Sequence, residues 1–351
     1  MPISIGSSQS ITTTEPPNRI AEREAQALTK LQKTDEWKTV ANILITPSWY
    51  LFQQSSITER IALAKETFCM DDAEDIPVLN AVLQRLTQLG YERIKEDNTI
   101  PYADNERSNY AVDNRSLLES SVIIGTVGFC KKEYAWDEPF IKGLNDEIKD
   151  IKLKGLEPVF LSGADPAGIG GRIKDIAQKE NIPIITLLTQ SGLEQRAGQI
   201  LIDKRENIIA VPNSEGRGYG WSTSTKQLGL EWITLICLIM KGRMLVAGGG
   251  DVAKIETTQG LALEVPMKYY DMLDKSGNPA AISQRSADGG DAIISLLIEG
   301  GKLHYSHHSN CFVNTVEARN EQPALMHSPS TTDIYTADSI ARTRIRALST
   351  A

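Results

Sequence analysis

The sequence predicts an α/β fold in which a parallel sheet carries helices on both faces and follows a helical N-terminal region. From about residue 119 onward, short apolar runs alternate with helical stretches, which is typical of parallel strands joined by crossover helices. Before that point, Ala21, Ala25, Leu28 and Leu31 recur three and four positions apart, as residues on one face of a helix do. The change of pattern near residue 118 indicates a domain boundary.

The chain divides into four predicted segments. Residues 1–18 are rich in Ser, Thr and Pro and form a predicted disordered leader. A helical N-terminal region covers residues 19–118, the sheet domain covers residues 119–300, and C-terminal strands with a loose tail cover residues 301–351. The leader is similar in composition to those of effectors exported by specialised bacterial secretion systems, although an ordinary flexible terminus is the simpler interpretation.

The helical region contains two further local signals. Ser56 and Glu59 form a capping-box pattern ahead of an apolar run. A helix is predicted from Pro77 to Leu89 and is expected to stop at Gly90. Residues 101–115 are rich in Asn and Asp and have no periodicity, which predicts a loop.

Short strands alternate with helices in the predicted sheet domain. The predicted strands span Val122–Val127, Pro158–Leu161, Ile182–Leu188, Ile208–Val211 and Met244–Ala247. The predicted helices span residues 137–153, the stretch from Gly171 to about Glu180, Thr225–Lys241 and Asp291–Glu299.

The amino-acid composition limits which binding partners and which cellular compartment we expect for this protein. The 37 Lys and Arg residues against 45 Asp and Glu residues give a net charge of −8, so a broad surface for nucleic acid is not expected. No C-x-x-C pair occurs among Cys69, Cys130, Cys237 and Cys311, which predicts neither a zinc site nor a disulfide framework. No apolar run has the length of a membrane span, and no secretory signal is present. We therefore expect a soluble cytoplasmic protein, without a cofactor, whose partner is a small molecule. Whether it forms a homo-oligomer stays open.

The most informative stretch is Leu245–Glu256, in which an apolar strand leads into the glycines Gly248–Gly250 and then into a helix. Glycines let the backbone approach a ligand closely, and a helix N-terminus offers unpaired N–H groups and the positive end of its dipole. Such a turn is suited to an anion, most often a phosphate. Glu256 follows about one and a half helical turns later, where its side chain can point back to the ligand. Leu261–Pro266 is predicted as the next strand.

A second glycine-rich segment, Gly163–Gly171, follows the strand Pro158–Leu161 in the same way. In a parallel sheet, ligands bind at the carboxyl ends of the strands, where the strand order reverses. Because glycine loses more conformational entropy on folding than other residues, its repeated use at two strand ends favours one shared binding pocket.

Three short motifs lie between Ser121 and about Tyr270, namely Ile123–Phe129, Phe160–Gly171 and Gly248–Pro266. Together they resemble the superfamily that joins the Smf/DprA DNA-processing proteins with the Lonely-guy nucleotide hydrolases, often called SLOG. About 150 of the 351 residues are covered. The resemblance implies a Rossmann-like sheet that binds a nucleotide.

The Lonely-guy motif P-G-G-x-G-T-x-x-E ends in a catalytic glutamate. Aligned on Glu256, it matches its first two glycines to Gly249–Gly250, whereas Gly248, Val252 and Ala253 replace the family's proline, third glycine and threonine. The ligand-binding residues that the glycine loops and this resemblance imply are Gly125, Thr126, Gly128, Ser162, Gly163, Ala164, Gly168, Gly170, Gly171, Gly248, Gly249, Gly250, Asp251, Val252 and Ala253.

The family's catalytic arginine precedes this turn on a helix, and the helix predicted at Thr225–Lys241 contains Lys226 but no arginine. Arg217 or Lys226 would supply the cation, although a solvated loop position is the alternative for Arg217. Asp251 would bind a ribose hydroxyl or cap the following helix. Trp221 would stack on a base or pack in the core.

Two functional hypotheses follow. With Glu256 and Arg217 as catalytic residues, the protein would hydrolyse the N-glycosidic bond of a nucleotide or nucleotide sugar. Alternatively, it would bind an ADP-ribose-like nucleotide as a sensor without turning it over. The negative net charge disfavours a third hypothesis, a DNA-binding protein similar to the Smf branch.

His304, His307 and His308 form the one histidine cluster in the sequence. Strand alternation would place His304 and His308 on one face and His307 on the other. Because this alternation does not gather the three side chains on one face, an exposed edge strand is favoured over a metal site.

Overall fold

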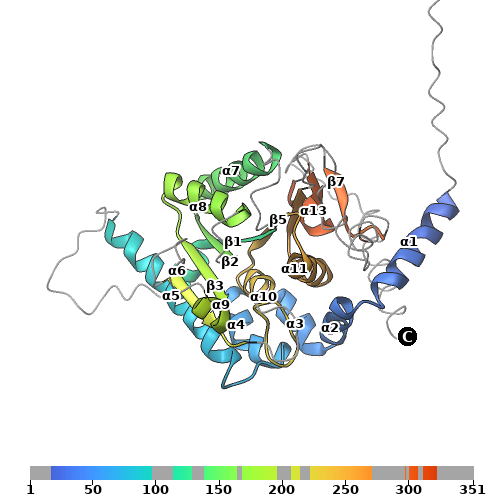
Figure 1. The fold of residues 1–351 in the computed structure, drawn as a ribbon, viewed down its shortest axis with the longest axis horizontal. Coiled ribbons are helices and arrows are strands. Elements are labelled where there is room, and N and C mark those ends of the chain that lie inside the picture. Colours follow the sequence, from blue (N-terminus) through green and yellow to red (C-terminus); the bar gives the residue numbers. More distant parts are fainter. Residues whose placement is uncertain are drawn as a thin grey trace, which may run out of the picture.

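The computed structural model describes residues 17–96, 114–128, 138–163, 168–195, 207–213, 222–270, 297, 300–306 and 311–321. Within these residues, helices cover a mostly parallel, eight-stranded sheet (Figure 1). The predicted α/β class is therefore confirmed. None of the described helices combines the length and the hydropathy that crossing a membrane requires.

The strand order reverses at the centre of the sheet, between β1 and β5. Neighbouring strands run β4-β3-β2-β1-β5-β6-β8-β7. Pairs from β4 through β6 are parallel, whereas β8 pairs antiparallel with both β6 and β7. The strands are β1 (Ser121–Gly128), β2 (Glu157–Gly163), β3 (Ile184–Thr189), β4 (Ile208–Val211), β5 (Arg243–Ala247), β6 (Met267–Tyr270), β7 (His304–Ser306) and β8 (Cys311–Val313).

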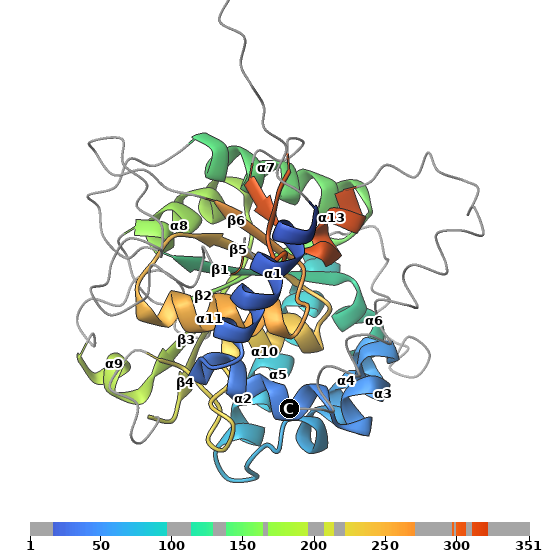
Figure 2. The same cartoon turned by 90° about the vertical axis from the view of Figure 1, so that its right-hand side faces the viewer.

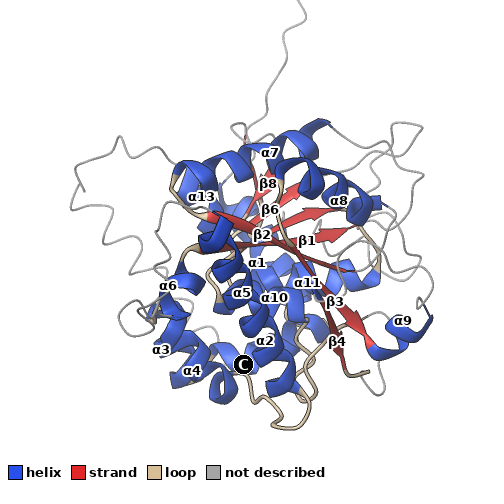
Figure 3. Cartoon of the chain, turned by 90° about the vertical axis from the view of Figure 1, so that its left-hand side faces the viewer, coloured by secondary structure: helices blue, strands red, loops and turns tan. Residues whose placement is uncertain are grey.

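Helices pack on both faces of the sheet (Figure 3). On one face, α7 and α8 bury Ile124 and Leu245 of the central strands. On the other face, α10 and α11 bury Ile123 and Met244, as the two-residue period of a strand requires. These helices are α7 (Glu138–Leu153), α8 (Gly168–Glu180), α10 (Trp232–Ile239) and α11 (Asp251–Ala262), and the shorter α9 (Gln190–Gln195) and α13 (Thr315–Glu321) lie near the sheet edges.

The N-terminal helices lie on the side of the sheet opposite α7 and α8 (Figures 1 and 2). There α2 packs on α11 and α4 on α10, while α5 and α6 contact β4 and β1. The apolar residues of these helices share one continuous core with α10, α11 and the sheet. The hydroxyls of Thr34, Thr46 and Ser56 cap three of these helices, and the capping box of Ser56 with Glu59 is confirmed. The helices are α1 (Pro17–Leu31), α2 (Asp35–Leu44), α3 (Pro47–Gln54), α4 (Ile57–Thr67), α5 (Asp75–Glu96) and α6 (Asn114–Glu119).

All five predicted strands are present as β1 to β5, with ends shifted by at most two residues. The helix predicted at Thr225–Lys241, however, begins only at Trp232. In the preceding turn, the N–H of Thr225 donates to the Leu230 carbonyl at 2.8 Å, and the N–H of Leu230 donates to the Thr225 hydroxyl at 3.0 Å. A threonine that pairs with nearby backbone in this way competes with helix formation.

Two other predicted boundaries are wrong. The strand predicted at Leu261–Pro266 starts instead at Met267, because α11 continues to Ala262 and Glu264 then takes a left-handed conformation with φ 59°. The helix predicted to stop at Gly90 continues to Glu96 as α5. Of the predicted loop at residues 101–115, the last two residues are helical, because α6 begins at Asn114. Residues 101–113 and nearly all of the predicted helix at 291–299 lie outside the described residues.

A buried group of charges connects α7 to the central strands. Glu147 is 2% exposed and accepts charged hydrogen bonds from Arg243 of β5 and from Lys268 of β6, the latter at 3.0 Å. Lys268 also lies 3.4 Å from the carboxylate of Glu317 in α13. Buried charges of this kind tolerate the loss of one partner poorly, because the remaining charge stays in a low dielectric.

We expect Glu147→Ala to lower the free energy of unfolding by about 3 to 5 kcal/mol, since it leaves two cations without their shared carboxylate. Asp150→Ala is the matched control, because Asp150 lies on the same helix but pairs with Lys154 at the surface. Its cost should stay below about 1 kcal/mol. Denaturant unfolding measures both, and equal losses for the two variants would contradict the role assigned to Glu147.

Candidate functional site

The carboxyl ends of β1, β2 and β5 lie side by side, with β1 in the centre. In the parallel register, Thr126 is opposite Ser162 of β2, and Gly128 is opposite Ala247 of β5. The strand order reverses between β1 and β5, which is the position where open α/β sheets bind ligands. The two glycine segments therefore flank the same strand.

Gly128 lies between the second glycine turn and α8, the helix that follows the first glycine segment. A Cβ atom on Gly128 would lie 2.3 Å from the Ala247 carbonyl oxygen and 2.3 Å from Cδ1 of Ile169 in α8. A Cβ atom on Gly249 would lie 2.3 Å from Cβ of Ala253 and 3.3 Å from Gly128. Because both glycines also have positive φ, +154° and +128°, neither position accepts a side chain without strain. The main chain of the second glycine turn and the side chain of Ile169 in α8 are thus held against the end of β1.

The second glycine turn leads directly into α11. Gly250 is the N-cap and makes no side-chain hydrogen bond, so Asp251 is the first residue of the helix and does not cap it. A Cβ atom on Gly250, or on Gly163 at the end of β2, would meet none of the described residues within 4 Å. The N–H groups of the first turn and the positive end of the helix dipole therefore lie beside open space at the carboxyl end of the sheet.

Most of the other predicted ligand-binding residues lie near the two glycine turns. Those at strand ends or in the first turns of α8 and α11 are Ser162, Gly168, Gly170, Gly171, Gly248, Val252 and Ala253. Gly125 instead lies beneath α10, where a Cβ atom would be 2.6 Å from Sγ of Cys237. Thr126 is buried, and its hydroxyl donates to the Leu161 carbonyl at 3.3 Å. Ala164 lies outside the described residues.

Glu256 lies in the second turn of α11 and is only 6% exposed. Burial first, and then the negative charge of Glu231 at the start of α10, raise the pKa of Glu256 well above its ordinary value of 4.5. The carboxyl group therefore keeps its proton to higher pH than an exposed glutamate does. Burial also raises the pKa of the neighbouring Cys237 to about 12, which excludes a thiolate at neutral pH.

Glu231 is a residue of this site that the helical pattern did not reveal. It is 0% exposed, and its Oε1 atom accepts a hydrogen bond of 2.5 Å from the Ser222 hydroxyl. Its backbone N–H donates to Oε1 of Gln259 in α11 at 2.8 Å. The one sequence signal that could have indicated it is an acid directly before the mostly apolar run Trp232–Ile239, since ionisable groups are rarely buried in such surroundings.

Of the two residues predicted to supply the cation, only Lys226 is among the described residues. Lys226 is held at the start of α5, where its ammonium lies 2.5 Å from the Glu74 carboxylate and its backbone N–H donates to Asp75 at 3.0 Å. Arg217 and Trp221 lie outside the described residues.

The histidine cluster is described only in part. His304 is exposed on β7, at the edge of the sheet, so the predicted edge strand is confirmed there. His307 and His308 lie outside the described residues, within which no group of three or more metal-ligand side chains occurs.

Two cavities lie away from the glycine turns. One of about 760 Å³ is lined by α4, α5 and α6, and one of about 470 Å³ lies between α5 and β4. Neither is lined by a glycine of the two turns or by Glu256, so they are separate from the candidate site.

We expect Gly249→Ala to destabilise the fold by about 1 to 3 kcal/mol from its backbone conformation alone, with the contact to Ala253 adding to this loss. Gly163→Ala is the control, because its Cβ atom has open space and its φ is not positive. It should stay within about 1 kcal/mol of the wild type. Denaturant unfolding without ligand checks the pair, and similar stabilities would contradict the close approach at Gly249.

The raised pKa of Glu256 predicts a pH-dependent stability. The unfolded chain releases this proton near pH 4.5, whereas the folded chain retains it to higher pH. Folding therefore loses stability as the pH rises from about 4.5 toward the folded pKa. Glu256→Gln, which cannot ionise, should gain stability relative to the wild type across this window. The free energy of unfolding of both proteins, measured at several pH values, tests this, and parallel curves would show that Glu256 titrates normally.

No protein-family model, curated protein or solved structure matches the chain. The functional assignment therefore rests on the chemistry of the site at the ends of β1, β2 and β5.

Proposed function

We propose that the protein binds a nucleotide or nucleotide sugar at the carboxyl ends of β1, β2 and β5 and hydrolyses its N-glycosidic bond, as Lonely-guy hydrolases do. The fold would then be a Rossmann-like member of the SLOG superfamily. One observation carries the proposal. The strands that lead into the two glycine segments flank β1, the second turn lies against Gly128, and the helix that follows this turn bears the buried acid Glu256.

The glycine turns suit the phosphate of such a ligand. The first turn of α11 offers N–H groups that have no partner within the helix, and its dipole favours an anion. Open space beside Gly250 and Gly163 gives a phosphate room to approach the main chain. Binding at this remote group would supply energy that orients the sugar for reaction.

Glu256 is the acid–base group in this proposal. Departure of a nucleobase leaves positive charge on the sugar and negative charge on the base, and a carboxyl group can stabilise the first or protonate the second. A carboxyl group with a raised pKa is suited to such proton transfer near neutral pH. Arg217, the other proposed catalytic residue, would balance the phosphate or the leaving group.

A non-catalytic nucleotide sensor is the second candidate. Ala253 stands where the family motif has threonine, and Lys226 is engaged with Glu74. The deep burial of Glu256 also limits its exposure to a ligand. These observations favour ligand binding without turnover.

Incubation of the full chain with nucleoside monophosphates and with NAD tests the two functions. Hydrolysis predicts a released base that is detected by chromatography, and Glu256→Gln should reduce its rate by about 10²- to 10⁴-fold, the range of general acid–base catalysis. Calorimetric binding without product would support the sensor. Absence of both binding and product would overturn the proposal.

The matched control is Glu36→Gln. Glu36 belongs to α2, and its carboxylate lies 3.2 Å from the ammonium of Lys254 in α11. This substitution should leave the rate of base release unchanged.

A further inference from the structure

We propose that the groove between α5 and the edge strand β4 binds an extended apolar peptide segment, which adds to the sheet as a further strand. The groove has a volume of about 470 Å³, which is within the range that bound ligands fill. None of the described residues of the glycine turns lines it. This binding function is therefore separate from the proposed nucleotide site.

The strand β4 lies at one end of the sheet. In the described part of the chain, Ile208–Val211 pair with β3 alone. An edge strand presents N–H and C=O groups that its single neighbour leaves unpaired, and these groups serve as a template for an added strand. The outer edge of β4 therefore offers main-chain donors and acceptors to a partner.

The residues that line the groove show that it runs along this edge. Three consecutive residues of β4, Ile208–Ala210, line it together with Pro212. Because successive side chains of a strand point to opposite faces of the sheet, three in a row reach one groove where it passes the strand edge. The opposite wall is one face of α5, formed by Pro77, Val78, Ala81, Gln84, Arg85 and Gln88.

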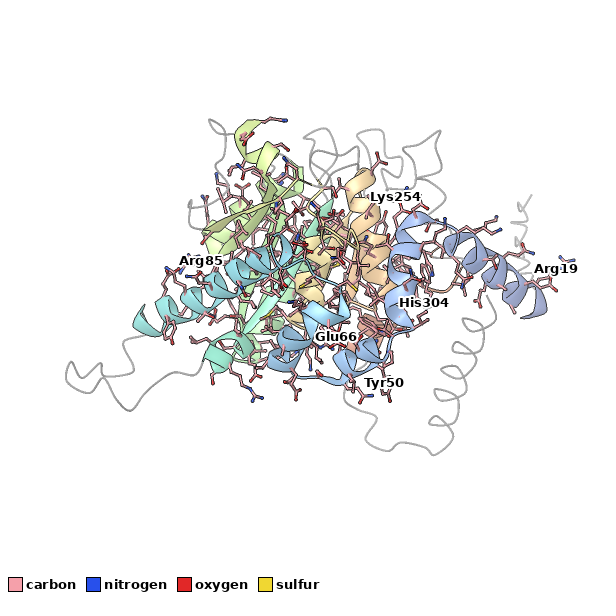
Figure 4. The ribbon with its side chains drawn as sticks, turned by 90° about the horizontal axis from the view of Figure 1, so that it is seen from below. Arg19, Tyr50, Glu66, Arg85, Lys254 and His304 are labelled. Atoms are coloured by element: carbon pink, nitrogen blue, oxygen red, sulfur yellow. The ribbon has the colours of Figure 1, made fainter. Side chains whose placement is uncertain are left out.

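Arg85 supplies a hydrogen-bond donor inside the groove, and it is labelled on α5 in Figure 4. The residue is 5% exposed, and its Nε donates to Oδ1 of Asn207, directly before β4. Its Nη1 donates to Oε1 of Glu92 at 3.2 Å. Nη2 has no hydrogen-bond partner among the described residues, yet they do not enclose it. This N–H group is thus available to a main-chain carbonyl of a bound segment.

The charges beside the groove are balanced. Among the described residues that line it, Glu74 and Arg85 are the charged ones. Glu74 lies 2.5 Å from the ammonium of Lys226, and Arg85 lies 3.2 Å from the carboxylate of Glu92. A charged ligand would therefore meet a like charge without an unpaired opposite charge to offset it. An uncharged segment with apolar side chains toward α5 fits this surface better.

The two walls favour an extended chain over a helix. An extended chain pairs with β4 along one edge and directs alternate side chains toward α5. A helix makes its own main-chain hydrogen bonds, so it would leave the edge of β4 and Nη2 of Arg85 unused. The hydrogen bond between Arg85 and Asn207 also fixes the start of β4 beside α5. Because the groove is formed before binding, less order has to be created when the peptide enters.

The test uses a displayed library of random peptides, selected against the full chain. We expect the selected peptides to carry alternating apolar residues. One of them, synthesised with blocked termini, is then measured by calorimetry. Methylation of alternate backbone nitrogens along one edge of this peptide should abolish binding, because it removes the N–H groups that face β4. Methylation along the other edge should leave the Kd nearly unchanged.

A pair of tryptophan variants tests the location. Ala81→Trp fills the groove from α5 and should raise the Kd at least about tenfold. Asn80→Trp is the matched control, because Asn80 is exposed on the same helix and does not line the groove. It should leave the Kd unchanged. If Ala81→Trp does not fold, Ala210→Trp replaces it, since Ala210 is exposed on β4 and lines the groove.

A third variant tests the donor. Arg85→Lys keeps a positive charge beside Glu92 but has no Nη2 group, so the Kd should rise about three- to tenfold, the contribution of one hydrogen bond. If Arg85→Lys does not fold, the tryptophan pair decides.

Four outcomes would overturn the proposal. The library yields no binder, or Ala81→Trp and Asn80→Trp bind the peptide equally well. Methylation along either edge abolishes binding alike, which would indicate a helical occupant. The wild type forms a dimer that Ala81→Trp dissociates, which would make a second copy of the chain the occupant of the groove.

Discussion

The close backbone approach at the carboxyl end of β1 is the constraint on which the site depends. Gly128 lies against the Ala247 carbonyl, against Ile169 of α8 and beside Gly249. Any side chain at Gly128 would separate β1 from β5 and lift the start of α8 away from the sheet. Because the strand order reverses at this same place, the packing that closes the sheet also brings the two glycine turns to one edge.

The packing of α10 against α11 gives the site its second property, a low dielectric around an acid. Glu256 faces α10, where the Thr234 hydroxyl donates to its carbonyl, and every residue of α11 from Thr257 to Ala262 is buried. Glu256 therefore loses its hydration although it lies in the second turn of the helix, close to the open end. A buried acid of this kind opposes folding at neutral pH, and such arrangements are concentrated where a protein uses proton transfer or binding.

Burial and reactivity make opposite demands on Glu256. Exclusion of water strengthens the interaction between Glu231 and Glu256, but it also limits the access of a ligand to the carboxyl group. Hydrolysis and sensing differ in how this balance is resolved. A hydrolase needs the acid to reach the leaving base, whereas a sensor needs only the main-chain N–H groups at the glycine turn.

Local features of the chain determined much of the architecture. Apolar runs bounded by turns were enough to predict β1 to β5, and the hydroxyl and carboxylate of Ser56 and Glu59 were enough to predict the start of α4. The glycines after β2 and β5 predicted a ligand-binding site at the ends of these strands. Such signals act within a few residues, because they arise from side-chain periodicity and from the conformations that glycine allows.

Only the tertiary structure decided how these parts meet. The apolar period predicted a helix through Glu231, but the hydroxyl of Thr225 and the left-handed Gly229 end that pattern and place the acid at the start of α10. Glu231 and Glu256 are far apart in sequence, and no local pattern relates them. Their proximity follows from the packing of α10 on α11, which depends on interactions between distant segments and so cannot be derived from either segment alone.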